Sequence, residues 1–593
     1  MLSLHWTIRA GLTTALALCL CGCSGSGSSG PEEPGGFVEA QPEPEPETPD
    51  PVVPPQVKDV AFLSPVDHLV RASMALRGVR PSVEDMEAVR DDPDKLPGLV
   101  DAYLDSPAFG ETIREMYDEV WLLRAFLFMF APRGEYEGMD MVEFDNSVGE
   151  SPLRLIEHVV MNDRPFTEIV TADYAVANEY VATVWGMDYD GDGQEWIETR
   201  YPEPGRPHAG ILSDSKLFIR HYSAPLNAQR GRANAISKGL LCFDFLARDI
   251  DVSGNVDLSD PEAVKNAVKS PACASCHQTL DPLGGFFWSY EYFVFPSDTQ
   301  QYPMSTWRPE YEQHRPFFSG REPGYFGLEA DDLQDLGARI AADPRFAQCA
   351  ARRFYGYFAQ VDPKEVPFDL VAHLQGAFVD SGMSAKALAR AAVLSDAFRA
   401  SHGESEAAAA DLVGLKKLRP RDASRMMADL TGFTWQTRVD FSIFAERGVT
   451  SPYGTIDLMK DTLLGYEVLM GGLDDFVVNQ PVHTFNPTMS LVMQAFATEA
   501  AGFVVDRDLD AIGPIRAKLL TEVDEEERDE ADLRAQLAQL HLRLFGEFVE
   551  PDGAEVDLSY ELFDAALKLS DDPRRAWKTT LTAMLQDSRL LYY

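Results

Sequence analysis

A five-residue segment near the middle of the chain places the strongest constraint on its fold. Cys273-Ala274-Ser275-Cys276-His277 has C-x-x-C-H spacing, and two thiols with an adjacent imidazole match the requirements of covalent haem attachment. The cysteines would form thioethers with the haem vinyl groups, and the histidine would bind the iron as the proximal axial ligand. The pattern therefore predicts one haem c per chain, attached to Cys273 and Cys276 and ligated by His277.

The N-terminus predicts export to the compartment in which bacteria attach haem covalently. Arg9 is followed by an apolar run, residues 12–20, that is too short to span a membrane as a stable helix. The run ends in Leu20-Cys21-Gly22-Cys23, which resembles a bacterial lipobox. We expect a lipoprotein signal peptide over residues 1–22 and a lipid on Cys23; ordinary secretion with cleavage elsewhere is the alternative.

The segment after Cys23 has the composition of a tether. Residues 23–58 are first rich in Gly and Ser and then in Pro and Glu, so they contain too few apolar side chains to form a core. No later segment has the roughly 18 uninterrupted apolar residues that a membrane helix requires. We therefore expect a disordered linker and a body held at the bacterial cell envelope, on the periplasmic face or outer membrane, only through its N-terminal acyl anchor.

Cysteine use supports this assignment. The chain has seven cysteines, and the signal peptide, the lipid and the haem account for five of them. The other two, Cys242 and Cys349, lie in a compartment where disulfides persist. They form either a disulfide or two separate buried thiols.

The charge balance constrains the partners. With 52 Lys and Arg against 95 Asp and Glu, the net charge is -43. Such a surface repels nucleic acid and anionic headgroups and favours a basic redox protein as partner. General solubility is the alternative explanation of the charge.

The body reads as helical. Apolar residues recur at three- and four-residue spacing over residues 109–123, 332–358 and 533–548, and Ser82 after Pro81 offers a helix start. A chain of 593 residues exceeds one core, so we expect a mainly α, multi-domain helical protein with a c-type haem-binding region. The expected boundaries are 1–22 signal peptide, 23–58 linker, 59–205 N-terminal helical domain, 206–330 haem-binding region, 331–405 helical region completing the haem domain and 406–593 C-terminal helical domain.

The residues after the motif suggest how a haem would be held. Pro282, Gly284 and Gly285 predict a turn just after His277, with the Pro282 carbonyl accepting a hydrogen bond from the second ring nitrogen of His277. Arg230 and Arg232 are either partners of the haem propionates or members of a solvated helix face.

The sixth iron position is left open by the sequence. Met304, in a Pro-Met-Ser loop, is the first candidate, and His208, His221 and His314 are the others. A methionine gives a higher potential than a histidine, and a vacant position permits peroxide or oxygen chemistry.

Two acidic segments resemble calcium loops. Asp188, Asp190 and Asp192 are followed by Gly193, with Glu198 one place before the twelfth loop position. A similar run covers residues 249–260. Each is a candidate calcium site or an acidic surface turn.

The segment Cys273-Ala274-Ser275-Cys276-His277-Gln278-Thr279-Leu280-Asp281-Pro282-Leu283-Gly284 is similar to the signature of planctomycete-type cytochrome c proteins. Residues 208–212, 230–232, 239–242, 343–347 and 349–354 resemble other parts of the haem region of that family, and residues 76–81, 162–166, 418–420 and 430–432 resemble its flanking modules. The resemblance implies a large, secreted, helical monohaem protein built of domains of unknown function.

Together these features predict an envelope-anchored monohaem c-type cytochrome that transfers electrons. A haem peroxidase-like oxidoreductase and a binding or scaffold lipoprotein with structural haem are the alternatives. Since the chain has neither a nucleotide-binding glycine loop nor a G-x-S-x-G motif, redox chemistry is a better expectation than hydrolase or transferase activity.

Overall fold

The structure is a computed structural model that describes residues 57–124, 130–223, 225–247, 271–294, 301–406, 412–442, 453–474, 477–511 and 517–593. The predicted signal peptide, the predicted lipidation site Cys23, nearly all of the predicted linker and the second candidate calcium loop at residues 249–260 lie outside these ranges. Val52–Tyr593 forms one compact unit.

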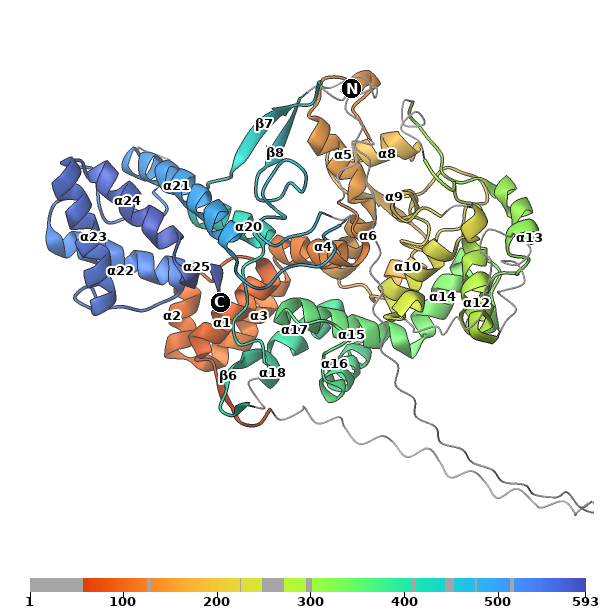
Figure 1. The fold of residues 1–593 in the computed structure, drawn as a ribbon, viewed down its shortest axis with the longest axis horizontal. Coiled ribbons are helices and arrows are strands. Elements are labelled where there is room, and N and C mark those ends of the chain that lie inside the picture. The colour runs from red at the N-terminus through yellow and green to blue at the C-terminus, as the bar shows by residue number, and fades with distance from the viewer. Residues whose placement is uncertain are drawn as a thin grey trace, which may run out of the picture. The chain divides into compact units, whose positions relative to one another are not determined.

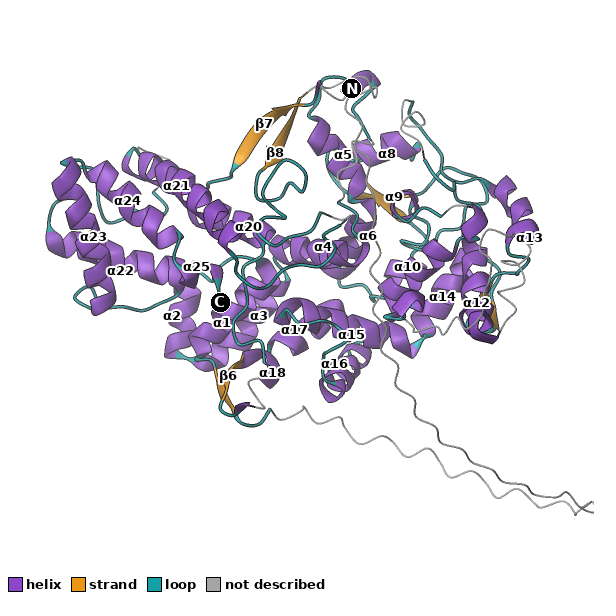
Figure 2. Ribbon diagram, in the orientation of Figure 1, coloured by secondary structure: helices purple, strands orange, loops and turns teal. Residues whose placement is uncertain are grey.

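The described chain is mainly helical, which confirms the mainly α part of the predicted fold class (Figures 1 and 2). The helices before the C-x-x-C-H segment are α1 (Pro65–Arg77), α2 (Val83–Asp91), α3 (Leu96–Leu104), α4 (Pro107–Trp121), α5 (Met141–Gly149), α6 (Ser151–Met161), α7 (Glu168–Thr171), α8 (Glu179–Trp185), α9 (Ser215–Arg220) and α10 (Arg230–Leu241). Ser82 caps α2 as predicted, because its hydroxyl accepts a hydrogen bond from the Asp85 amide at 3.0 Å.

The C-x-x-C-H segment lies on α12 (Pro271–Gly284). The later helices are α13 (Arg315–Phe318), α14 (Leu333–Ala342), α15 (Pro344–Ala359), α16 (Phe368–Asp380), α17 (Ala385–Val393), α18 (Asp396–Arg399), α20 (Pro420–Thr431), α21 (Pro487–Leu509), α22 (Glu530–Phe545), α23 (Ala554–Ser570), α24 (Pro573–Leu585) and α25 (Ser588–Leu591).

The helix predicted over residues 332–358 is two helices, α14 and α15. Asp343 separates them in an extended conformation, because the following Pro344 disfavours helical geometry in the residue before it. The Asp343 carboxylate then caps α15 by accepting from the Arg345 amide at 2.9 Å.

The described strands form four antiparallel pairs. They are β1 (Val60–Phe62) with β6 (Ala400–Gly403), β2 (Ala175–Ala177) with β3 (Ile197–Thr199), β4 (Gly324–Tyr325) with β5 (Leu328–Glu329), and β7 (Gln436–Asp440) with β8 (Tyr453–Asp457). The β1–β6 pair joins segments more than 300 residues apart, and the buried Arg71 of α1 reinforces it by donating to the carbonyls of Phe398 and Ala400.

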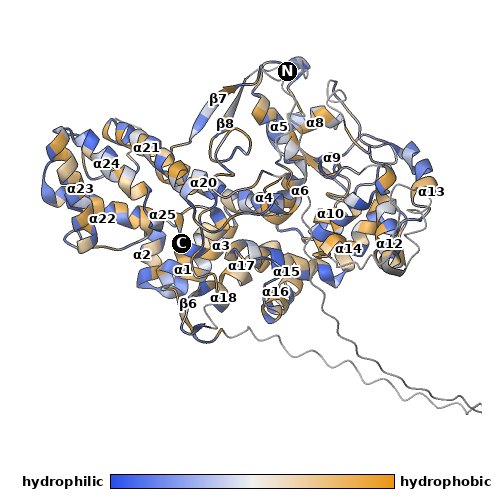
Figure 3. Cartoon of the chain, in the orientation of Figure 1, coloured by the Kyte–Doolittle hydropathy of each residue, from blue (hydrophilic) through white to orange (hydrophobic). Residues whose placement is uncertain are grey.

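One hydrophobic cluster runs through the described body. It extends from Leu69 of α1 to Leu591 of α25 and includes Cys276, Leu280 and Leu283 of α12. Hydrophilic and hydrophobic residues are interspersed along the helices (Figure 3), as expected of helices that bury one face in a core. The motif helix is therefore anchored in the same core as the two ends of the described body.

Among the described helices, α21 is long and apolar enough to cross a membrane by length and composition. Half of its most apolar window is buried inside the protein, and it packs against α24 and α20. This burial is also what is expected of a core helix.

Candidate functional site

The C-x-x-C-H residues occupy neighbouring positions on α12. Because Cys276 and His277 follow Cys273 by three and four residues, the three side chains project from one side of the helix. Cys276 is buried, Cys273 is half-buried, and both thiols are free. The structure thus brings the three residues together on a regular helix that packs against α10 and β4.

The His277 imidazole is held by a carboxylate one turn later. Nδ1 of His277 lies 2.9 Å from Oδ1 of Asp281, whose side chain is 5 % exposed. Burial alone would raise the pKa of Asp281, but hydrogen bonds from His277 and Arg230 lower it below its ordinary value. The ionised carboxylate therefore accepts a hydrogen bond from Nδ1–H, and in a neutral imidazole this contact selects the tautomer whose Nε2 carries no proton.

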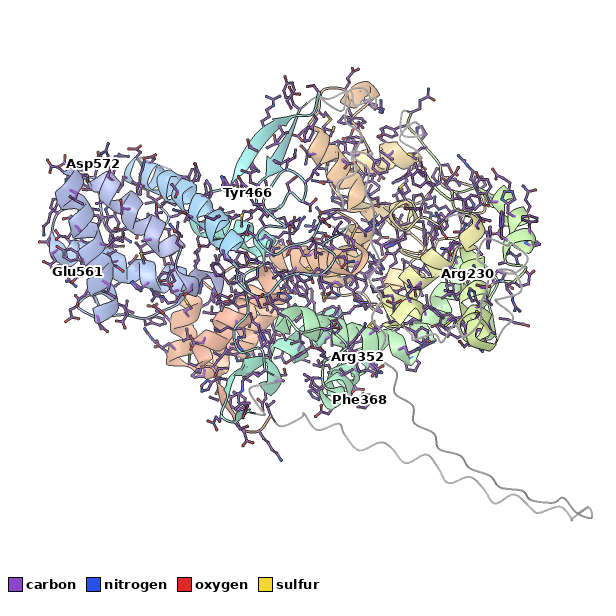
Figure 4. All side chains as sticks on the ribbon, viewed as in Figure 1. Arg230, Arg352, Phe368, Tyr466, Glu561 and Asp572 are labelled. Atoms are coloured by element: carbon purple, nitrogen blue, oxygen red, sulfur yellow. A yellow bond between two sulfur atoms is a disulfide. The ribbon has the colours of Figure 1, made fainter. Side chains whose placement is uncertain are left out.

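Arg230, at the start of α10, completes this arrangement (labelled in Figure 4). Its Nε and Nη2 lie 2.6 Å and 3.0 Å from the two carboxylate oxygens of Asp281. A bidentate contact of this kind fixes the plane of the carboxylate, so the orientation of the His277 ring is set through Asp281 by a second helix. Hereafter we call Arg230, Asp281 and His277 the histidine clamp.

Two expectations about this region are wrong. The chain does not turn after His277, because α12 continues through Pro282 to Gly284. Because the helix continues, Asp281 lies four residues after His277 on the same face. The Asp281 carboxylate, and not the Pro282 carbonyl, therefore accepts the hydrogen bond from the His277 ring.

The glycines after Asp281 serve close packing. A Cβ atom on Gly284 would lie 2.7 Å from the Ala228 carbonyl oxygen, and one on Gly285 would lie 2.8 Å from Cα of Pro323. The end of α12 therefore approaches the backbone that leads into α10, and this approach brings Asp281 within reach of Arg230.

Arg232 has a structural role in the described body. Its buried guanidinium donates to the backbone carbonyls of His221, Phe218 and Glu291, and burial lowers its pKa to about 9. It therefore joins α9, α10 and the segment after α12, where it satisfies several carbonyl groups at once.

The structure does not bring Met304 to the motif. Met304 packs against the cluster around Phe144 and Trp185, and its amide donates to the Val184 carbonyl at 2.8 Å. Cys276 belongs to the other, larger cluster.

The three histidines considered as sixth ligands each have a partner. Nε2 of His208 accepts from the Tyr201 amide at 3.0 Å, and Nδ1 of His314 lies 2.6 Å from the Tyr292 hydroxyl. Nε2 of His221 donates to the Trp121 carbonyl at 3.0 Å, and burial lowers the pKa of His221 to about 3. His221 is therefore neutral and half-buried against α4.

The first acidic loop does not gather its predicted ligands. Glu198 lies 3.0 Å from Nε2 of His158 and pairs with Arg164, while the Tyr189 hydroxyl donates to the carbonyls of Gly193 and Glu195. Within the described ranges, no group of three His, Cys, Asp or Glu side chains is arranged to hold a metal ion.

Cys242 and Cys349 form a disulfide, with Cα atoms 5.3 Å apart. Cys242 ends α10 and Cys349 lies on α15. The bond therefore fixes the helix that carries Arg230 to the core.

A polar cavity of about 470 Å³ lies between α4, α5, α20 and the β7–β8 pair. Its walls include Glu150, whose pKa is held well below the usual range by Arg114 and Arg124 in spite of burial. The residues lining this cavity are separate from α12, and the sequence patterns did not point to it because its charges come from segments far apart in the chain.

Comparison with models of protein families, with curated proteins and with solved structures finds no match to this chain.

Proposed function

We propose that this chain is an exported, lipid-anchored monohaem c-type cytochrome that transfers electrons and is similar to the planctomycete-type cytochrome c proteins. The histidine clamp is the observation that supports it most directly. A histidine that donates one ring proton to a carboxylate presents its other nitrogen to a metal in a fixed orientation, and here that histidine follows two free thiols at the spacing of covalent haem attachment.

The described residues fit a haem c on this reading. Cys273 and Cys276 would hold the macrocycle, and Nε2 of His277 would ligate its iron. Bound haem supplies a one-electron iron couple. The part of this chain is to orient His277 and to increase its basicity through Asp281, which favours the ferric state and lowers the reduction potential.

The proposed location and partner rest on the N-terminal segment and on the net charge of the chain. Cys23 would carry the lipid, residues 23–58 would form the spacer, and the body would act at the cell envelope. The net charge of -43 favours a basic protein as electron donor or acceptor.

A peroxidase-like oxidoreductase is the second candidate, and the surroundings of Met304, His208, His221 and His314 favour it. All four have other contacts in the structure, so none of them is positioned as a sixth ligand. A haem held by His277 without a sixth ligand from these four residues would be suited to peroxide chemistry.

One experiment separates the two candidates. The protein is produced in a host with cytochrome c maturation, and its reduced and oxidised spectra are recorded with and without peroxide. Electron transfer predicts reversible oxidation by a basic redox protein and no peroxide turnover, whereas rapid peroxide consumption by high-spin iron supports the oxidoreductase. Protein without haem contradicts both.

A further inference from the structure

Helix α23 has two apolar faces. Val556 and Phe563 are buried in the core, where α23 packs against α22 and α24. A second set points into solvent: Leu558 is 72 % exposed, Leu562 36 % and Leu569 89 %, and Ala565 is exposed as well. Figure 1 shows α23 at the left edge of the helices that follow α20.

The exposed set is regular. Residues 558, 562, 565 and 569 are separated by four, three and four positions, which is the spacing of a seam between two helices. Single exposed leucines are common on protein surfaces, but an apolar stripe along about three turns of one helix marks an interaction face.

The charges beside this stripe are self-complementary. Glu561 (labelled in Figure 4) and Lys568 each precede a seam leucine by one position, on the same side of the stripe. If two copies of α23 pack antiparallel about a twofold axis, Leu558 faces Leu569 of the partner subunit. Leu562 then faces Ala565 of the partner subunit, and Glu561 lies beside Lys568 of the partner subunit. A parallel pair would not bring these opposite charges together.

The side chains are free to make these contacts. The Lys568 side chain is 74 % exposed and pairs with Asp564 of its own helix, an interaction worth little on an open surface. A change of side-chain rotamer would bring the Lys568 ammonium group to Glu561 of the partner subunit.

We propose that α23 is the surface through which two copies of this chain associate as an antiparallel helix pair. The occupant of the stripe is a second copy because the twofold arrangement satisfies both apolar and charged positions. A single helix of 17 residues offers a small interface, so the dimer is reversible. The net charge of -43 on each copy opposes association, and added salt therefore strengthens it. This inference is independent of haem.

Sedimentation velocity of the full chain over a concentration series tests the apolar part. We expect the apparent mass to rise with concentration from that of one chain toward twice that mass, and added salt to favour the rise. The double variant Leu558→Gln, Leu569→Gln should raise the dissociation constant about tenfold or more. Leu415→Gln with Leu491→Gln is the matched control, because these leucines are 66 % and 67 % exposed elsewhere, and it should leave association unchanged.

The charged positions test the arrangement itself. Glu561→Lys should weaken association several-fold, because it places two cations side by side across the axis. Adding Lys568→Glu to that variant should restore wild-type association. A monomer at every concentration and salt level, a dimer indifferent to the leucine substitutions, or a double charge variant as weak as the single one would overturn the proposal.

Discussion

The ring nitrogen Nδ1 of His277 lies 2.9 Å from the carboxylate oxygen Oδ1 of Asp281, one helical turn later on α12. Arg230 of α10 donates to both oxygens of this carboxylate, so Oδ1 contacts His277 and Arg230 at once. The two contacts fix the plane of the His277 ring and favour the tautomer that is protonated at Nδ1. They also make the properties of that nitrogen sensitive to residues outside the C-x-x-C-H pentapeptide.

In the proposed haem-bound protein, Asp281→Asn should raise the reduction potential. A neutral amide accepts the Nδ1 proton less strongly than a carboxylate does, so His277 becomes less basic and stabilises ferric iron less. If the ferric state loses about 1.4 kcal/mol of stabilisation relative to the ferrous state, the potential rises by about 59 mV for one electron. Potentiometric titration should detect a rise of that order. Asp572→Asn, at the N-cap of α24, is the control, because asparagine caps equally well. An unchanged potential in Asp281→Asn would show that the histidine clamp does not tune the iron ligand.

Gly284→Ala should loosen the contact between α12 and α10. Its Cβ would meet the Ala228 carbonyl oxygen at 2.7 Å, and because this atom belongs to the backbone, one helix has to shift. We expect a loss of about 1–3 kcal/mol in the free energy of unfolding, measured by denaturant titration. Gly376→Ala, on α16 with open space around the new methyl group, should instead stabilise by about 0.5–1 kcal/mol. Equal effects of the two substitutions would contradict the packing described for Gly284.

Breaking the Cys242–Cys349 disulfide should destabilise the protein. The bond closes a loop across 107 residues and so restricts the unfolded chain strongly. The double variant Cys242→Ala, Cys349→Ala should lose about 2–4 kcal/mol of unfolding free energy. Reductant should reproduce this loss in the wild type and have no further effect on the double variant; a reductant effect of the same size in both would show that the bond contributes nothing.

Lys416 should make stability depend on pH. Its side chain is 3 % exposed, and burial, aided by the charge of Arg71, lowers its pKa from 10.5 to about 7. Between about pH 7 and 10.5 the unfolded state therefore binds more protons, so this residue makes the protein more stable as pH rises through that window and least stable below it.

Lys416→Met should remove this dependence and raise the free energy of unfolding below pH 7 by about 2 kcal/mol. Denaturant titrations at several pH values measure both effects. Lys238→Met is the control, because Lys238 has a side chain that is 62 % exposed, and it should change neither. A parallel pH profile for wild type and Lys416→Met would contradict the assigned cause.

Local signals were readable in the sequence. The start of α2 at Ser82 was predicted correctly because capping depends on residues a few positions apart. The partner of His277 was also within reach, since Asp281 follows it by four residues, but Pro282 and two glycines suggested a turn. Those glycines instead allow close contact with the backbone at Ala228 and Pro323. No local sequence pattern reveals such a contact.

Long-range relationships were not readable. Arg230 precedes Asp281 by 51 residues, and only the packing of α10 on α12 brings them together. Likewise, one hydrophobic cluster includes residues from Leu69 to Leu591. These residues come from segments that the sequence alone suggested were separate regions.

The most direct test is whether haem stays on the polypeptide after acid–acetone extraction, measured as pyridine haemochrome on protein from a host with cytochrome c maturation. The account predicts one haem per wild-type chain and little or none in Cys276→Ala, with full retention in the Cys242→Ala, Cys349→Ala variant. Wild-type protein that loses all its haem, or Cys276→Ala protein that keeps it fully, would contradict the assignment of this segment as a haem site.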